Sequence, residues 1–249
     1  MKNKNEDYIK AYQIDSENSK NYYQKFLNQK SEQQKFLEEI LGEDDKSNFK
    51  ICDIACGSGT LTHHLLQKFP NADFFLADIN DTALTLAKEN LDTKRNIEFL
   101  NSSVFALDYK SETFDRVFCW QTLLALDKPQ DALNELIRIC KPGGKVILSS
   151  LFNIHHDVDI YTSFIDHTLA SSKENIYMQY NTISAFTLKK WLDGKAASHK
   201  LYEFIPKVDF KNSSTNPRGT GSFTLDTPDK KIQVTGGMLM NWAILEITK

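Results

Sequence analysis

The chain has 249 residues, of which 41% are hydrophobic and 25% are charged, and its formal net charge is -3 at pH 7. This composition is that of an ordinary globular protein and excludes extended disorder as the main state of the chain. A slightly acidic protein offers no general basic field to a phosphate backbone, so we predict no nucleic-acid partner.

The cysteines and the apolar runs give two further exclusions. The four cysteines form no CxxC pair and have no histidine at metal-ligand spacing, so we interpret them as buried thiols in a reducing compartment and predict no metal. No apolar run reaches the length of a membrane span, and the N-terminal segment MKNKNEDYIK has no hydrophobic signal core. These features predict a cytoplasmic protein without a membrane partner.

The N-terminal part is predicted to be an arm followed by a helix. Residues 1–20 are polar, and the apolar spacing from Asn21 to Leu41 predicts a helix that Gly42 ends. The segment GEDDKSN then indicates a charged connector. We therefore expect residues 1–48 to form an arm and a cap helix, and residues 49–249 to form the main domain.

The next hundred residues alternate between strand and helix patterns. Strands are predicted at 49–55, 73–79, 96–100, 114–120 and 145–152, and helices at 60–69, 81–91 and 128–140. Pro70 ends the first of these helices, Asp81 is a candidate cap of the second, and KPGG is a predicted turn. Strands separated by helices predict a doubly wound α/β domain with a parallel sheet.

Beyond Phe152 this alternation stops. We predict a helix over 155–172 and a short helix over 187–194, with Thr187 as its cap and Gly194 at its end. Two further strands are predicted within 199–210 and 236–248, and the segment between them has the pattern of a β-hairpin. The C-terminal part is therefore expected to add both helix and hairpin to the sheet.

The segment DIACGSGT, from Asp53 to Thr60, follows the first predicted strand and is rich in glycine. In a doubly wound sheet such a turn lets a ligand approach the backbone closely, which predicts a nucleotide-like site. An NAD site would need a third glycine after Gly57 and Gly59, and Asp53 would repel a pyrophosphate. We therefore disfavour an NAD-dependent oxidoreductase.

Two acidic residues, Asp53 and Asp78, end the first two predicted strands. A carboxylate before the turn suits a ligand with a cationic end, such as S-adenosylmethionine, which carries an ammonium and a sulfonium. A carboxylate at the end of the second strand can accept hydrogen bonds from both hydroxyls of a ribose. The alternative for Asp53 is that it only ends its strand and caps the following turn.

At these residues the sequence resembles the class I S-adenosylmethionine-dependent methyltransferases of the small-molecule branch. The resemblance covers residues 49–152 through DIACGSGT, ADIN, SETFDRVF and RICKPGGKVIL. It implies a Rossmann-like, doubly wound, mostly parallel seven-stranded α/β sheet with an N-terminal helical cap and a C-terminal β-hairpin insertion. It also implies S-adenosyl-L-methionine as cofactor and acceptor-side elements at about residues 153–236.

The family pattern implies cofactor roles for residues at the strand ends. Asp53 would lie near the methionine ammonium, directly or through water, and Asp78 with Ile79 would hold the ribose and adenine. The backbone cradle would consist of Ala55, Cys56, Gly57 and Gly59. Around the methyl group, the pattern implies Cys119 and Trp120 as lining residues.

The N-terminal helix and two departures from the family pattern complete these assignments. Tyr23, and less directly Tyr22, would close over the methionine end, unless these tyrosines only pack their helix onto the sheet. Ala55 replaces the usual first glycine, and Ser103 stands where the family often has an aspartate that accepts from the adenine amino group. A serine hydroxyl accepts less strongly, while the backbone N–H of Val104 can still meet the ring.

Candidate acid–base residues follow the fifth predicted strand. His155 and His156, together with Asp157, lie at the sheet edge where ligands bind, so we predict the two histidines as general bases. A polar helix start is the alternative for this group. A hydroxyl acceptor would need such a base, whereas an ionised acceptor would not. Arg218 is either an anion hook for the acceptor or a solvated turn charge.

Together, these inferences predict methyl transfer from S-adenosylmethionine to a small-molecule acceptor, with an oxygen of a sugar or phosphate-bearing metabolite as the methylated atom. A faint resemblance of the C-terminal half to bacterial polysaccharide-associated methyltransferases supports that acceptor class. The alternative is a non-catalytic S-adenosylmethionine-binding protein with the same fold, and Ser103 is the only residue that supports it. We expect a monomer or a homodimer.

Overall fold

The computed structural model describes residues 27–91, 95–165, 177–209, 222–235 and 238–249. Within these residues, one sheet has the strand order β3-β2-β1-β4-β5-β12-β8, and β7 and then β6 extend it from the end of β5. The bounds of these strands are β1 Lys50–Ile54, β2 Asp73–Asp78, β3 Ile97–Asn101, β4 Phe114–Trp120, β5 Cys140–Asn153, β6 Ile160–Ile165, β7 Tyr177–Ser184, β8 Ser198–Glu203 and β12 Trp242–Thr248.

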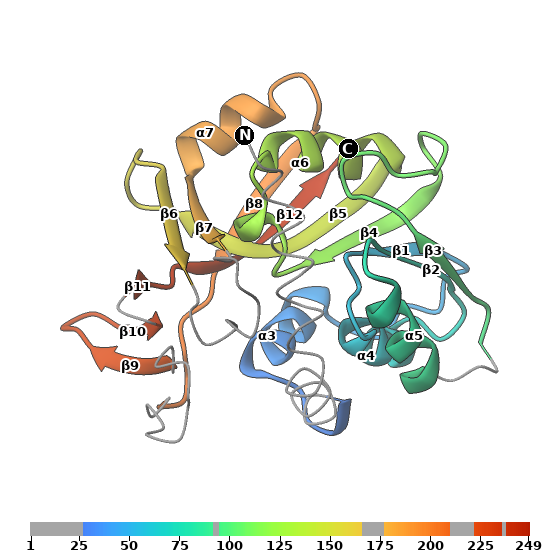
Figure 1. Ribbon diagram of the computed structural model, residues 1–249, viewed down its shortest axis with the longest axis horizontal. Coiled ribbons are helices and arrows are strands. Elements are labelled where there is room, and N and C mark those ends of the chain that lie inside the picture. Colours follow the sequence, from blue (N-terminus) through green and yellow to red (C-terminus); the bar gives the residue numbers. More distant parts are fainter. Residues whose placement is uncertain (1–26, 92–94, 166–176, 210–221, 236–237) are drawn as a thin grey trace.

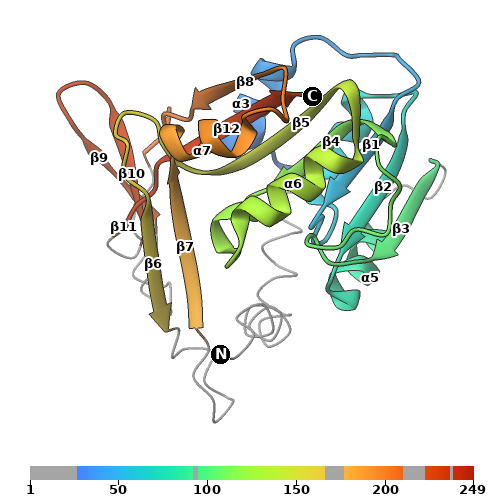
Figure 2. The same cartoon turned by 90° about the horizontal axis from the view of Figure 1, so that it is seen from above.

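The strand directions follow from the connections. Strands β3, β2, β1, β4 and β5 run parallel, because each crossover connection returns the chain to the end of the sheet at which the previous strand began. Strand β12 is antiparallel to both neighbours, β5 and β8. This path of seven strands confirms the predicted mostly parallel sheet. Figure 2 shows β6 and β7 extending away from the sheet as an additional antiparallel pair.

Helices cover both faces of the sheet. Their bounds are α3 Glu32–Leu41, α4 Thr60–Lys68, α5 Asp81–Asn90, α6 Pro129–Ile139 and α7 Ala185–Leu192, with a short 3-10 helix, η1, at Leu123–Ala125. Figure 1 shows α6 and α7 on one face and α3, α4 and α5 on the other. Each face has its own hydrophobic core, and burial of these apolar side chains is the main force that holds the layers together.

The region after β5 differs from the sequence prediction. The segment expected to be a helix over 155–172 contains β6, which pairs antiparallel with β7. β-Branched and aromatic side chains such as Ile160, Tyr161 and Thr162 favour the extended backbone, and pairing with β7 overrides the helical spacing. The predicted β-hairpin is present as β9 Ser222–Asp226 and β10 Lys231–Thr235, which form a second small sheet with β11 Met238–Leu239.

Three helices are capped by residues that were not predicted as caps, and the predicted helix start at Asn21 lies outside the described residues. Helix α3 begins after Ser31, whose Oγ accepts from Gln34 N at 3.2 Å while Gln34 Oε1 accepts from Ser31 N at 2.7 Å. Asn80, rather than Asp81, caps α5, because its Oδ1 accepts from Thr82 N at 2.9 Å.

Helix α7 begins at Ala185 with Ser184 as its cap, so Thr187 is not the cap but the third helical residue. The predicted end of α3 at Gly42 is confirmed, because this residue lies at φ +73° and its N–H closes the helix on Glu38. The predicted KPGG turn is part of the long β5, and residues 204–209 are not strand. The region that the structure describes contains no helix long and apolar enough to cross a membrane.

Candidate functional site

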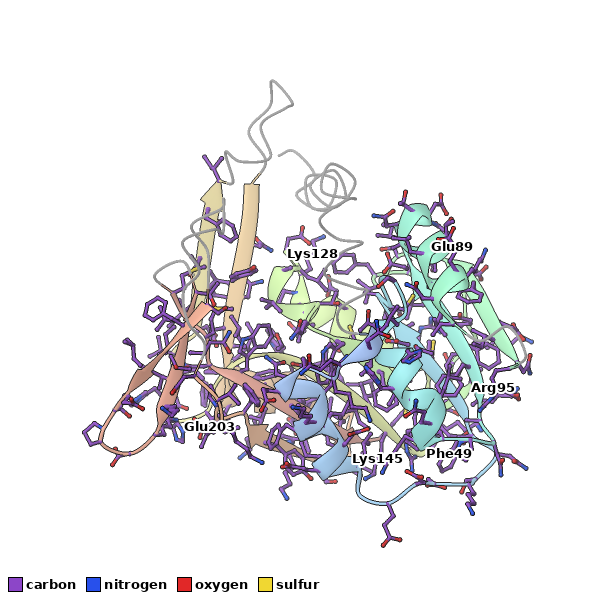
Figure 3. The ribbon with its side chains drawn as sticks, turned by 90° about the horizontal axis from the view of Figure 1, so that it is seen from below. Phe49, Glu89, Arg95, Lys128, Lys145 and Glu203 are labelled. Atoms are coloured by element: carbon purple, nitrogen blue, oxygen red, sulfur yellow. The ribbon has the colours of Figure 1, made fainter. Side chains whose placement is uncertain are left out.

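A cavity of about 730 Å³ lies at the carboxyl ends of the parallel strands. The ends of β1, β2 and β4 form one side, and residues of β7, β10 and β12 form the other. The start of α3 contributes to the wall between them, and Figure 3 shows this helix in front of the sheet, between its two halves. A volume of this size suits a cofactor together with a small acceptor.

The turn after β1 approaches the cavity through left-handed backbone. Ala55 and Gly57 lie at φ +55° and φ +56°, and both line the cavity together with Cys56. Ala55 is a non-glycine residue in a region that costs L-residues about 1–2 kcal/mol. Such a strained residue at a strand end is typical of a functional site, where the backbone shape is maintained despite its cost.

Asp53 is a buried carboxylate at the back of the cavity. It is 1% exposed, and its Oδ2 accepts a hydrogen bond from Thr62 Oγ1 at 2.6 Å. Its Oδ1 is buried without a partner among the described residues. Burial raises the pKa of Asp53 to about 7, the bond from Thr62 lowers it, and the nearby charge of Asp78 raises it. An unpaired buried carboxylate oxygen is costly and calls for a donor or a cation.

Asp78 ends β2 and fixes the turn. Its Oδ2 accepts from Gly57 N at 2.9 Å and its Oδ1 accepts from Asn80 N at 2.9 Å. Burial raises its pKa, while these backbone bonds lower it. Asn80 also lines the cavity, and its Nδ2 is buried without a partner in the described chain. Two carboxylates and one unpaired amide donor therefore lie at adjacent strand ends.

Two predicted cofactor residues do not line the cavity. Cys119 is completely buried in the core beside α6, and burial raises the pKa of its thiol to about 12, so it is a packing residue. Gly59 lies at φ +79°, and a Cβ there would lie 2.9 Å from Leu91 Cδ1. Glycine avoids the strain that an L side chain would have at this positive φ, and Leu91 leaves little room for a Cβ.

The other predicted strand-end residues lie together. Ile79, Ser103, Val104 and Trp120 all line the cavity. Ser103 Oγ accepts a weak bond from Phe105 N at 3.3 Å, and Ile79 is exposed. Tyr22, Tyr23 and Arg218 lie outside the described residues.

A three-residue hydrogen-bond network joins α3 to the strand ends. Gln33 Oε1 accepts from Gln121 Nε2 at 3.0 Å and from Ser149 Oγ at 3.1 Å. Gln33 and Gln121 line the cavity, and Gln121 lies at φ +51° in the left-handed region. Sequence analysis missed Gln33, because its partners are 88 and 116 residues away along the chain.

The two candidate bases do not line the cavity. The side chain of His155 is 61% exposed and its Nε2 lies 3.2 Å from Glu203 Oε2, and His156 is exposed. Glu203, labelled in Figure 3 at the end of β8, also pairs with Lys230 of the β9–β10 hairpin. Asp157 is exposed as well. The geometry therefore places His155 in a surface ion-pair cluster with Glu203 and Lys230, next to the exposed His156 and Asp157.

An aromatic wall completes the site, and sequence analysis missed it. The cavity is lined opposite the glycine turn by Tyr180 of β7, Phe204 after β8, Met240 between β11 and β12, and Trp242 at the start of β12. Each lies in a segment whose sequence pattern indicates only a strand or a connection, and their convergence depends on strand order. The described residues contain no group of three histidine, cysteine or acidic side chains that could hold a metal.

Comparisons with known proteins point to one enzyme class. A family profile described as a methyltransferase domain matches residues 45–205. Demethylmenaquinone methyltransferase of Lactococcus lactis is 32% identical over 176 residues, which are 69% of this chain and 63% of that protein. Malonyl-acyl-carrier-protein O-methyltransferase 2 of Ilyobacter polytropus is 27% identical over 156 residues, which are 63% of this chain and 58% of that protein. The matches thus span less than two thirds of each relative.

A similar fold is found in a chain of the complex between the Haloferax volcanii Trm112 methyltransferase activator and a methyltransferase. The TM-score is 0.61 at 14% sequence identity, and the match covers 96% of both chains. At this identity the likeness concerns the fold alone, and it extends over the C-terminal strands as well as the parallel half of the sheet.

Proposed function

This chain belongs to the class I S-adenosylmethionine-dependent methyltransferase family, and from this membership we propose that its cavity binds S-adenosyl-L-methionine and that the protein methylates a small molecule. The observation that carries the proposal is the pair of buried carboxylates, Asp53 and Asp78, beside the left-handed turn. A negatively charged pocket at the carboxyl ends of the strands, where the strand order of a parallel sheet reverses, suits a ligand with a cationic end and a ribose.

The residues present fit this cofactor. Asp53 Oδ1 and Asn80 Nδ2 are buried polar atoms without partners in the described chain, and both residues line the cavity. An ammonium can satisfy the first atom, directly or through a water molecule, and a ligand oxygen can satisfy the second. We assign Asp53 to the methionine ammonium and Asp78 to the ribose hydroxyls. Asp78 is already bound by two N–H donors, and a carboxylate has about four acceptor sites.

The neighbouring residues have supporting roles in this proposal. Ala55, Cys56 and Gly57 present backbone to the ligand, Ile79 and Val104 supply apolar contacts to the adenine, and Ser103 supplies a hydroxyl beside it. Trp120 ends β4 at the same edge and is assigned to the transfer site. When bound, the cofactor supplies a methyl group on a sulfonium, which passes to a nucleophilic acceptor atom and leaves S-adenosylhomocysteine.

The protein's own contribution to transfer is alignment of the acceptor and exclusion of water. Helix α3 serves this purpose, because Gln33 is held to β4 and β5 by hydrogen bonds and Phe36 packs on Phe204 with ring centroids 5.8 Å apart. His155 and His156 are left out of the proposal as bases because both are exposed and neither lines the cavity. Among the described residues that line the cavity, no histidine is present to act as the base for a hydroxyl acceptor.

Calorimetry with S-adenosylhomocysteine and with NADH tests the proposal. We expect S-adenosylhomocysteine to bind and NADH not to bind, because Asp53 and Asp78 would repel a pyrophosphate. Methyl transfer is then followed with methyl-labelled S-adenosylmethionine. Binding of NADH alone would contradict the proposed cofactor, and cofactor binding without transfer across a broad acceptor panel would contradict the enzymatic part of the proposal.

A further inference from the structure

We propose that the acceptor is an uncharged, planar apolar molecule with one hydrogen-bonding oxygen, a phenol-like compound rather than a sugar or a phosphate ester. The inference rests on the proposed function and concerns the end of the cavity opposite the glycine turn. It differs from the acceptor class predicted from the sequence, because the residues that line this end of the cavity are far apart in the sequence and come together only in the fold.

The aromatic wall described above, which consists of Tyr180, Phe204, Met240 and Trp242, is from here on called the acceptor wall. Phe204, Met240 and Trp242 are 9%, 7% and 8% exposed and belong to one hydrophobic cluster, with Tyr180 packed against it. Aromatic walls favour flat ligands, because ring contacts bury much area in a defined geometry. A sugar ring would leave most of its hydroxyl groups without partners against this surface.

The charges of the described residues at the cavity disfavour an anionic acceptor. Among the described residues that line the cavity, the charged ones are Lys30, Glu32, Asp53 and Asp78. Lys30 is paired with Glu38 and Glu32 with Lys35, so the start of α3 carries compensated charge. The acceptor wall itself contains no cation. A phosphate or carboxylate there would be desolvated without a counter-ion and would face two carboxylates across the cavity.

The polar groups on this side are mostly satisfied by one another. Ser222 and Thr235 share a hydrogen bond of 2.7 Å, and Gln233 Nε2 lies 3.3 Å from Ser222 Oγ. All three line the cavity from the β9–β10 sheet. Their hydrogen bonds leave few groups for the several hydroxyls of a sugar.

Two neutral donors belong to residues that line the cavity, one on α3 and one in the acceptor wall. Both bonds to the Gln33 carboxamide end on its Oε1, which leaves the Nε2 amide group as a donor at the cavity. Trp242 Nε1 is buried and has no partner within the described residues. Such donors can hydrogen-bond the oxygen of a phenol, and the preference for a neutral acceptor comes from the lack of a cation in the acceptor wall.

The test uses protein saturated with S-adenosylhomocysteine and follows binding by calorimetry. The probes are 1-naphthol, 1-naphthyl phosphate with the same rings, methyl glucoside and glucose 6-phosphate. We expect 1-naphthol to bind, 1-naphthyl phosphate to bind at least tenfold more weakly, and the two sugars not to bind. Tighter binding of either phosphate than of 1-naphthol would overturn the inference.

Variants locate the binding site. Phe204→Ala is expected to weaken 1-naphthol binding at least fivefold without changing the affinity for S-adenosylhomocysteine. The matched control is Phe186→Ala, because this phenylalanine of α7 is 49% exposed and does not line the cavity. Should Phe204→Ala not fold, Trp242→Phe keeps a ring but loses Nε1, and it should weaken 1-naphthol more than naphthalene. Equal 1-naphthol affinity in the wild type and the folded variant would contradict the inference.

The two proposals fail separately. Absence of S-adenosylhomocysteine binding would contradict the proposed function, and 1-naphthol binding to the cofactor-free protein would still support the acceptor class. Binding of S-adenosylhomocysteine together with failure of 1-naphthol to bind would overturn the acceptor class and leave the proposed cofactor in place.

Discussion

Replacing Asp53 with asparagine should make the cofactor-free protein more stable at alkaline pH. The pKa of the buried carboxyl is about 7 in the folded chain, against 3.8 for the ordinary group. Because the folded-state pKa is raised, the neutral carboxyl contributes stability below pH 3.8, and this stability is lost as the pH rises through 7. A rise of about three units corresponds to about 4 kcal/mol.

The asparagine side chain is neutral at every pH and keeps an oxygen for the hydroxyl of Thr62. The free energy of unfolding of the variant should therefore exceed that of the wild type by about 1 kcal/mol at pH 4.5 and by about 4 kcal/mol at pH 8. Urea unfolding at pH 4.5, 6 and 8 measures this difference, with the exposed Asp229→Asn as control. A constant difference between Asp53→Asn and wild type across this range would refute the reasoning. Because the proposed function assigns Asp53 to the methionine ammonium, we also expect the same variant to bind S-adenosylhomocysteine more weakly than the wild type at pH 8.

Three further changes test the turn and its neighbours. Asp78→Ala should weaken S-adenosylhomocysteine binding by about 1–3 kcal/mol, because ribose hydroxyls lose a charged acceptor, and calorimetry showing equal affinity would speak against that role. Ala55→Gly should raise the free energy of unfolding by about 1 kcal/mol, because glycine adopts the φ of +55° without strain, and a less stable variant in urea would contradict this. Gly59→Ala should lower it by about 2 kcal/mol, because alanine is strained at a φ of +79° and its Cβ crowds Leu91, and unchanged thermal unfolding would contradict this.

The parallel half of the fold could be predicted from the sequence because its determinants are local. Strand β4 has the predicted bounds, and α4 and α6 end within one residue of the predicted positions. The turn chemistry around Gly57 and the carboxylates at the strand ends lie within short segments, so they also identify the cofactor side of the cavity. Asn80 and Asp81 are both suitable N-cap residues for α5, and the predicted cap, Asp81, was wrong because Asn80 caps the helix.

The acceptor side could not be predicted because it depends on tertiary pairing. The sequence of β6 is compatible with a helical stripe, and only its pairing with β7 decides for a strand. Gln33 meets Ser149 across 116 positions, and no local pattern marks either residue. His155 and His156 follow β5 as expected, but the chain turns there toward Glu203 and away from the cavity. Proximity in sequence to a strand end was therefore not enough to place a side chain in the site.

The position of β12 has a consequence for the nascent chain. This strand follows β8 in sequence but lies between β5 and β8, so β8 has no partner in the sheet until residues 242–248 have been synthesised. While the ribosome is still translating, one edge of β5 must remain unpaired along residues 145–151. Unpaired edges invite association with other chains, and contacts between distant residues form slowly. Until β12 pairs with it, this edge of β5 is therefore open to association with other chains.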